Sequence, residues 1–221
     1  MLFELFKTDP TLFAMLAPIL LLSLSLHEYA HARIALAYND PTALRAGRVT
    51  LNPIKHLDLF GTLMLFFAGF GWAKPVPVNP YLLKPPKIGN IMVSLGGPMT
   101  NFLLAVLCCG AIKLLILTGS SLQPTLLGRL HFALYYGIII NILLGVFNML
   151  PIYPLDGHHI VRELLPRYHQ EPFMRFQLKY GYMILIAIMI LPRFGMIPDI
   201  INPIVEYVEK ALLSLTGISA T

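Results

Sequence analysis

The first long apolar stretch of the chain, residues 12–31, reads LFAMLAPILLLSLSLHEYAH. It carries no charged residue before position 27 and then presents His27, Glu28 and His31 within five positions. Histidines four residues apart lie on the same face of a helix, so their imidazole nitrogens can meet at one metal ion. Ionisable groups inside a membrane segment are costly and are functional by default. The stretch therefore predicts a membrane helix that carries a metal site.

The segment His27-Glu28-Tyr-Ala-His31 is an H-E-x-x-H pattern, which is typical of zinc metalloproteases. In that chemistry the two histidines bind zinc and the glutamate takes a proton from water at the metal. The alternatives are a chance match, or buried histidines that are satisfied by hydrogen bonds. The apolar surroundings weigh against chance, so we predict His27 and His31 as zinc ligands and Glu28 as the catalytic base.

The composition indicates an integral membrane protein. Of the 221 residues, 57% are hydrophobic and only 12% are charged, whereas soluble domains have about a quarter charged residues. The net charge of +5 does not indicate nucleic-acid binding, because the basic residues fall in loops between apolar stretches. The two cysteines, Cys108 and Cys109, are adjacent in an apolar run and are interpreted as packing residues. The acidic Glu4 and Asp9 argue against a signal peptide.

The apolar stretches predict an all-α, multi-pass bundle of about four to six membrane segments. The first helix is expected over residues 11–38, and at 1.5 Å per residue it would be about 42 Å long, more than the hydrocarbon core of about 30 Å. The second helix contains Gly96-Gly-Pro98, which allows close contact and a kink. A polar stretch at 167–177 precedes the last span, and the terminal amphipathic helix is expected at the interface. The later helices are expected over residues 88–117, 130–150, 178–191 and 200–215.

The region between the first two long helices has a different pattern. Residues 42–58 are polar, and Arg48–Asn52 within them predicts a short strand before Pro53. Residues 59–73 are apolar but only 15 residues long, which predicts a hairpin, a short helix or a re-entrant segment. Proline and valine alternate in residues 74–79, so this stretch is expected to be extended.

The distribution of lysine and arginine predicts the orientation. Residues 32–58 hold four of them, 73–88 hold three and 151–180 hold four, while 119–129 hold one. Because positively charged loops stay in the cytoplasm, the crowded side is expected to be cytoplasmic and the N-terminus external. His27 lies 16 residues into the first helix, about 24 Å along its axis. The metal site is therefore expected within the bilayer, nearer the cytoplasmic face.

A catalytic zinc site needs a third protein ligand. Asp156 is favoured because it follows an apolar span broken by two prolines, so the backbone can turn back into the bundle. The alternative is that Asp156 caps a short helix that ends at Pro166, and the spacing alone leaves both open. For His56 and Asp58, a polar turn that anchors a loop is favoured over a gate, a partner of a ligand or a transient ligand. The remaining histidines considered are His131, His158, His159 and His169.

Together with Asn148-Met-Leu-Pro-Ile-Tyr-Pro-Leu-Asp156-Gly157, the H-E-x-x-H motif resembles the site-2 protease family of intramembrane zinc metalloproteases. The resemblance covers about residues 20–165 and is greatest to short prokaryotic members, because no inserted domain such as a PDZ module is visible. One departure is His158-His159, where the family more often has glycine and a basic residue, which keeps a local alternative ligand open. The further matching segments are Asn52-Pro-Ile-Lys-His56-Leu-Asp58, Gly71-Trp-Ala-Lys-Pro-Val-Pro-Val-Asn79 and Gly96-Gly-Pro-Met-Thr-Asn101.

The resemblance implies one zinc ion per chain, bound by His27, His31 and Asp156. It implies that Glu28 is the catalytic base and that Asn148 holds the substrate or the developing oxyanion. The implied reaction is hydrolysis of peptide bonds in or near transmembrane segments of membrane-protein substrates, as in regulated intramembrane proteolysis. Membrane-tethered regulators such as anti-sigma factors, pro-proteins and remnant signal peptides are the implied substrate classes.

The resemblance also implies a single membrane-embedded metalloprotease domain over residues 1–221, in the cell membrane of a prokaryote. Its catalytic core is expected over residues 11–165, followed by a C-terminal span and amphipathic helix over 178–215. A transmembrane substrate and the lipid bilayer are the expected partners. Because a helical substrate hides its scissile carbonyls, it must unwind, and we expect it to pair by strand addition with Val76–Val78.

Two other functions use the same residues. A membrane metal-binding or metal-transport protein could use the histidines, but it would show further intramembrane ligands along a path and often a repeat. The chain shows one compact ligand set, and a transporter would not need Glu28 as a base. The third interpretation is an inactive scaffold, which the complete set of ligands and base argues against.

Overall fold

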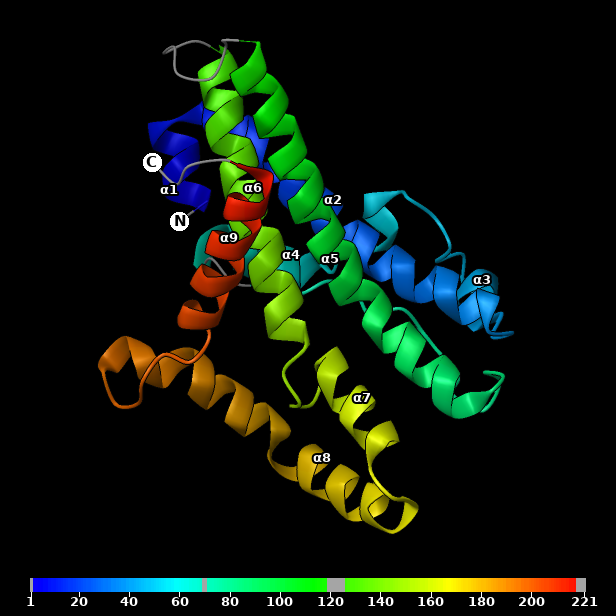
Figure 1. Cartoon of the computed structure of the whole chain (residues 1–221). Coiled ribbons are helices and arrows are strands. Elements are labelled where there is room, and N and C mark those ends of the chain that lie inside the picture. Colours follow the sequence, from blue (N-terminus) through cyan, green and yellow to red (C-terminus); the bar gives the residue numbers. More distant parts are fainter. Residues whose placement is uncertain (1, 69–70, 119–125, 218–221) are drawn as a thin grey trace.

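The computed structural model describes residues 2–68, 71–118 and 126–217, and this part of the chain is helical throughout its regular structure (Figure 1). Four of these helices are long and apolar enough to cross a membrane: α2, α5, α6, and α8 continued to Phe194. The all-α, multi-pass prediction is thus confirmed. The helices are α1 (Leu2–Thr8), α2 (Pro10–Ala37), α3 (Thr42–Arg45), α4 (Leu59–Ala68), α5 (Pro86–Leu117), α6 (Leu126–Asn148), α7 (Asp156–Leu164), α8 (Arg167–Ile190) and α9 (Asn202–Thr216), with the short 3-10 turns η1 (Pro53–Lys55) and η2 (Leu191–Phe194).

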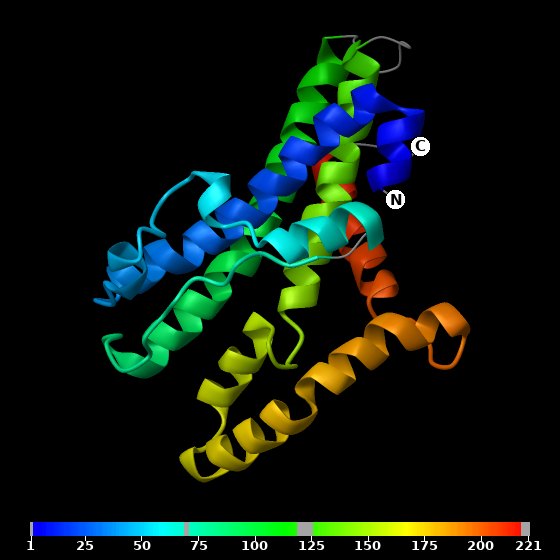
Figure 2. The same cartoon turned by 180° about the vertical axis from the view of Figure 1, so that it is seen from behind.

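Helices α2, α5 and α6 form the centre of the bundle, where each packs against the other two (Figures 1 and 2). Their apolar core extends to α9, whose apolar face packs against α5 and α6. Cys109 lies in this core as a free thiol and Cys108 packs against it, which agrees with the predicted packing role. The buried members of the core are Ala105, Cys109, Ile112, Ile138, Ile142, Val146, Val205 and Leu213.

Helix α2 begins and ends at residues with clear local causes. Asp9 caps its first turn, where the Leu12 N–H donates to the carboxylate across 3.0 Å and holds the pKa of Asp9 below its usual range. Pro10 follows, at a position where a missing N–H costs nothing. Asn39 adopts the left-handed conformation, with φ 71°, and ends the helix one residue from the predicted limit. The helix therefore runs unbroken through the H-E-x-x-H motif.

The predicted strand at Arg48–Asn52 is wrong. Within the described residues, the β-type pairing consists of a single bridge between Leu57 and Ala73. The polar side chains take other partners: Arg48 donates to backbone carbonyls at residues 74 and 75, and Asn52 accepts from the Ile54 N–H to cap η1. For the apolar segment that follows, the structure selects the short helix among the three alternatives, as α4.

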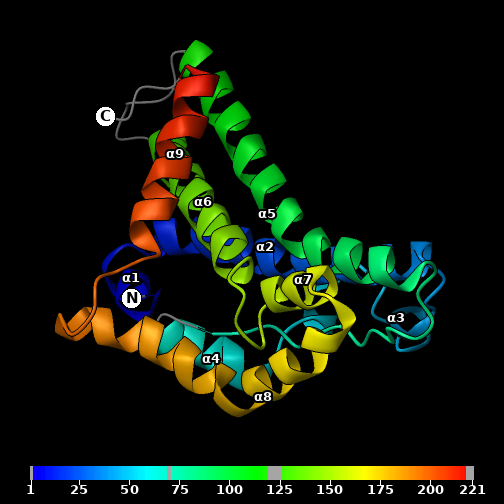
Figure 3. The same cartoon turned by 60° about the horizontal axis from the view of Figure 1, so that its bottom comes forward.

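The last membrane span begins earlier than predicted. The polar residues 167–177 form the first half of α8, directly after Pro166, instead of preceding the span. Charged side chains one turn apart support this half, because Glu171 and Arg175 form an ion pair at 2.5 Å. Helix α8 contacts α7 and lies apart from α5 and α6 (Figures 1 and 3). It therefore meets the site through α7 and through the turn that precedes α7.

Candidate metal centre

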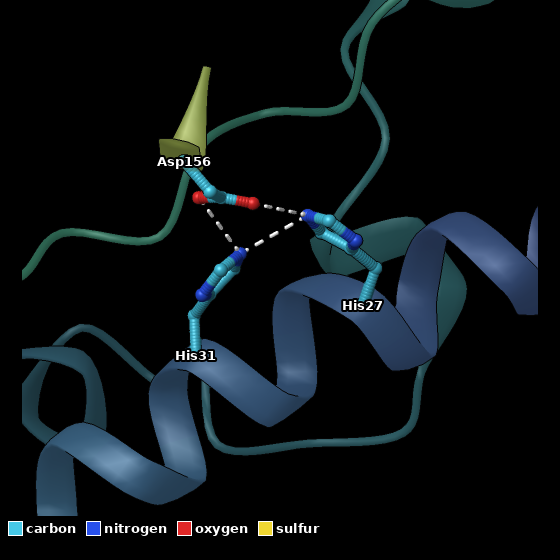
Figure 4. A group of neighbouring side chains, drawn as sticks. All are labelled: His27, His31 and Asp156. Carbon is cyan, nitrogen blue, oxygen red and sulfur yellow. Dashed lines mark hydrogen bonds and ion pairs between the residues drawn. The ribbon is translucent and has the colours of Figure 1, made fainter. Parts of the chain in front are cut away.

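Three side chains from two helices converge inside the bundle (Figure 4). His27 and His31 come from successive turns of α2, and Asp156 is the first residue of α7. The two Nε2 atoms lie 3.0 Å apart. Oδ2 of Asp156 is 3.3 Å from Nε2 of His27, and Oδ1 is 3.4 Å from Nε2 of His31. Both histidines are buried, so these atoms face one another away from solvent.

These distances fit a metal site. In a tetrahedral zinc site with bonds of about 2.0–2.1 Å, the ligand atoms lie about 3.3 Å from one another. Nδ1 of His31 is 2.7 Å from the carbonyl oxygen of Val93, which can only accept, so the ring proton is on Nδ1. Its Nε2 then has a lone pair facing Nε2 of His27 and the Asp156 carboxylate. A cation at the centre of this triangle could be bound by all three side chains, because each presents a lone pair to it.

Helix α5 leaves space for a metal at this point because residue 97 is glycine. A Cβ built on Gly97 would lie 2.5 Å from Nε2 of both His27 and His31. Any side chain there would occupy the space between the ligand nitrogens. Gly96 allows the same close approach one residue earlier, since its Cβ would meet Ile34 of α2 at 2.5 Å. The small residues that the sequence placed in a helix contact therefore also form one wall of the metal centre.

Asp156 reaches the histidines because the chain reverses between α6 and α7. Gly157 lies against the end of α6, where a Cβ would come 2.2 Å from the carbonyl oxygen of Met149. Gln177 of α8 is buried and holds the turn from outside: it accepts from the Tyr153 N–H at 2.8 Å and donates to the carbonyl of Pro151 at 2.8 Å. The turn between α6 and α7 is therefore held on two sides, which fixes the position of the Asp156 backbone.

Glu28 lies next to His27 on α2 and contacts the extended stretch of residues 74–79. The backbone N–H of Val76 donates to Oε2 of Glu28 at 3.0 Å. The buried Arg48 donates to the carbonyl of Lys74 at 2.5 Å and to that of Pro75 at 3.3 Å. At the far end the Asn79 N–H donates to the buried Asp40 carboxylate at 2.6 Å. Side chains therefore hold both ends of the stretch, with its centre on Glu28.

The remaining residues considered in the sequence have local partners. His56 is buried with Nε2 2.7 Å from the carbonyl of Thr50, and Asp58 accepts from the Gly61 N–H at 2.8 Å at the start of α4. Nδ1 of His158 is 2.6 Å from the carbonyl of Leu155. Among the described residues, the one group that could hold a metal comprises His27, His31 and Asp156. His131 and His169 lie against aromatic neighbours in α6 and α8.

Burial lowers the pKa of both histidines that follow Asp156. Burial lowers the pKa of His159 to about 4, assisted by His158 and Arg162. Burial also lowers the pKa of His158 below its usual range. Their rings lie with centroids 3.8 Å apart at an interplanar angle of 42°.

Asn148 ends α6, where its Nδ2 donates to the carbonyl of Leu144 at 2.9 Å. No role at the metal site was predicted from the sequence for Val93, Gly97, Asn101 or Gln177. Asn101 and Gly97 lie in one of the segments that resemble the family. That resemblance could have marked both as candidate site residues. Gln177 lies in a polar stretch without a motif, and the contact that gives it a role arises only when α8 folds back onto the turn.

Comparison of the sequence with known proteins gives consistent matches. A sequence model of peptidase family M50 matches residues 15–192. YwhC of Bacillus subtilis is 37% identical over 173 residues, 78% of this chain and 78% of that protein. Rip2 of Mycolicibacterium smegmatis is 29% identical over 185 residues, 79% of this chain and 66% of Rip2. The zinc metalloprotease MJ0392 of Methanocaldococcus jannaschii is 25% identical over 170 residues, 77% of this chain and 37% of that protein. No solved structure matches the chain significantly.

Proposed function

The chain belongs to peptidase family M50, and from this premise we propose that it hydrolyses peptide bonds in or near transmembrane segments of membrane-protein substrates. It is a multi-pass membrane zinc metalloprotease with a His-His-Asp candidate metal site. In the proposal one zinc ion binds to His27, His31 and Asp156. The observation that carries the proposal is the convergence of these three ligand atoms beside Glu28, in a chain with four candidate spans.

In the proposed reaction, the residues around the site have different roles. Zinc, when bound, acts as a Lewis acid that polarises the scissile carbonyl and lowers the pKa of water. Glu28 takes the proton from the attacking water and transfers it to the leaving amine. The Val76 N–H holds the Glu28 carboxylate in one orientation. This contact keeps the base aligned, since a free glutamate side chain has several rotamers.

Asn148 stabilises the oxyanion in this proposal. Its amide nitrogen carries two protons, and one of them is donated to the Leu144 carbonyl. The other proton remains for the developing charge on the substrate, where one donor contributes on the order of 100-fold in rate. Asn148 lies at the end of α6, eight residues before Asp156, so oxyanion donor and metal ligand come from opposite ends of one turn.

The extended stretch over residues 74–79 is the proposed substrate dock. Its N–H at Val76 and its carbonyls at 74 and 75 already have side-chain partners, whereas no backbone pairing among the described residues joins 75–78 to another segment. The N–H of Val78 and the carbonyls of residues 76–78 are thus the groups that can pair with an unwound substrate. Val78→Pro removes that N–H, while Val78→Ala keeps it. We expect Val78→Pro to retain zinc and lose cleavage, and equal cleavage by both variants would exclude this dock.

The site is proposed to lie within the bilayer, nearer the cytoplasmic face of a prokaryotic plasma membrane. The support is the excess of lysine and arginine in residues 32–58, 73–88 and 151–180 compared with 119–129. The metal motif lies in the second half of α2, next to the first of these basic segments. Transmembrane regulators, pro-proteins and signal-peptide remnants are the proposed substrates.

The experiment measures zinc content and cleavage of a model transmembrane substrate by the purified protein. We expect wild type to bind one zinc ion and to cleave, and Glu28→Gln to bind zinc without cleavage. Asp156→Ala is expected to lose both. If Asp156→Ala keeps zinc and activity, the third ligand is elsewhere, and His158 and His159 are tested next. If wild type binds zinc but moves it across vesicle membranes without cleaving, the protease proposal is wrong and transport is favoured.

A further inference from the structure

A file of buried polar side chains runs from the metal centre through the middle of the bundle. Nδ1 of His27 is 2.6 Å from Oδ1 of Asn101 on α5. Nδ2 of Asn101 donates to Oδ1 of Asn141 on α6 at 3.0 Å, and Nδ2 of Asn141 donates to Oγ of Ser23 on α2 at 2.9 Å. Asn101, Asn141 and Ser23 are each at most 1% exposed. The file therefore begins and ends on α2, one turn apart.

The far end of this file allows one direction of hydrogen bonding. Nδ2 of Asn141 also donates to the backbone carbonyl of Gly137 at 2.9 Å, and a carbonyl can only accept. The hydroxyl of Ser23 donates its single proton to the carbonyl of Ile19 at 2.8 Å, so toward Asn141 it must accept. The amide group of Asn141 is therefore oriented by two acceptors. Rotated by 180°, its oxygen would face the Gly137 carbonyl oxygen with no proton between them.

The orientation passes from one amide to the next. Because Oδ1 of Asn141 faces Asn101, the group of Asn101 that faces it must be the NH₂. Oδ1 of Asn101 then faces His27 and accepts a proton from Nδ1. A flipped Asn101 would instead present N–H groups to Nδ1, which would move the ring proton to Nε2. A proton on Nε2 would occupy the position that a metal needs.

We propose that Asn101 and Asn141 are positioning residues that set the tautomer of His27, so that its Nε2 lone pair is available to the metal. This inference rests on the zinc site of the proposed function. Asn141 acts through Asn101, without touching His27. His31 needs no such device, because the backbone carbonyl of Val93 accepts from its Nδ1 and has no second orientation. The two ligands of the H-E-x-x-H motif thus have their tautomers set in different ways.

A carboxylate at position 101 separates this role from simple packing. The two oxygens of a carboxylate are equivalent, so it accepts from His27 in either orientation and does not need Asn141. Leucine at position 141 removes the polar group and keeps the same number and branching of side-chain heavy atoms. The test is a double-mutant cycle of Asn101→Asp and Asn141→Leu, with the zinc dissociation constant of the purified protein measured by chelator competition. The melting temperature of the metal-free protein reports on folding.

In the wild-type background we expect Asn141→Leu to weaken zinc binding about 10-fold, the lower range for groups that orient a metal ligand. In the Asn101→Asp background we expect the same substitution to leave zinc binding unchanged or to strengthen it, because it removes the Asn141 oxygen that faces the carboxylate. Tyr135→Phe is the control on α6, since it deletes a hydrogen bond to Glu209 at 2.6 Å that does not reach His27.

A purely structural role of Asn141 predicts a different result. The substitution would then lower the melting temperature and weaken zinc binding equally in both backgrounds, which would overturn the tautomer proposal while the zinc site stands. Equal zinc binding by wild type and Asn141→Leu would also overturn it. If wild type itself binds no zinc, both the metal centre and this proposal are wrong. The histidine ¹⁵N spectrum of the metal-free protein adds a direct measure, since His27 should change tautomer in Asn141→Leu.

Discussion

A Cβ at Gly97 would lie 2.5 Å from Nε2 of His31, so α5 contacts α2 at the point where the histidine nitrogens of the candidate metal centre converge. This contact predicts that Gly97→Ala lowers zinc affinity on the order of 100-fold, because the methyl group must displace a ligand or the metal. Gly110→Ala is the matched control on the same helix, where nothing lies within 4 Å of the added carbon. Zinc titration of both variants checks this, and equal affinities would contradict the geometry of the centre.

The hydrogen bonds of Gln177 predict that a substitution on α8 changes zinc binding at the metal centre. Gln177→Met leaves the Tyr153 N–H and the Pro151 carbonyl without side-chain partners, at a cost of about 1–3 kcal/mol in unfolding free energy. Because these groups hold the turn before Asp156, zinc affinity should fall as well. Gln170→Met, also on α8, removes a hydrogen bond to the carbonyl of Leu165 at the end of α7 and should lower stability without changing zinc affinity. Denaturant unfolding and zinc titration distinguish the two variants.

Substitution of Arg48 is expected to lower cleavage without changing the zinc content. Arg48→Met removes the donors to the carbonyls of Lys74 and Pro75, so the Val76 N–H should lose its alignment with Glu28. Cleavage of a model substrate should drop about 10-fold or more, in line with a misplaced base, while zinc content stays at the wild-type level. Arg33→Met, an exposed arginine on α2, is the control. Wild-type cleavage by Arg48→Met would show that the extended stretch does not position the base.

Substitution of Asp58 is expected to lower the free energy of unfolding and to leave zinc binding unchanged. The carboxylate accepts from the Gly61 N–H at 2.8 Å in the first turn of α4, so Asp58→Ala should cost about 1 kcal/mol in unfolding free energy. Asp58→Asn should restore most of it, because asparagine caps equally well. Zinc content should be unchanged in both variants. A loss of zinc in either variant would indicate that Asp58 binds the metal after all.

Much of the architecture could be predicted from local pattern, and the errors occurred where polar residues had distant partners. The helix at α2 ends within a residue of prediction, because a cap, a proline and a left-handed asparagine are all local signals. The strand at Arg48–Asn52 failed because Arg48 bonds to carbonyls 26 and 27 residues away. The polar half of α8 was missed because its polar residues suggested a loop, whereas its Gln177 bonds to residues 153 and 151, 24 and 26 positions away.

The sequence by itself determined the membrane class and two residues of the candidate metal site. Hydropathy acts over single segments, and His27 and His31 meet because a helix repeats every 3.6 residues. Only the tertiary structure decided between Asp156 as a cap and Asp156 in contact with the histidines, since that contact joins α7 to α2 across a reversed chain. The file through Asn101 and Asn141 was equally hidden, because its hydrogen bonds join residues 40 to 118 positions apart. Such contacts form only when three helices pack together, and no local pattern encodes them.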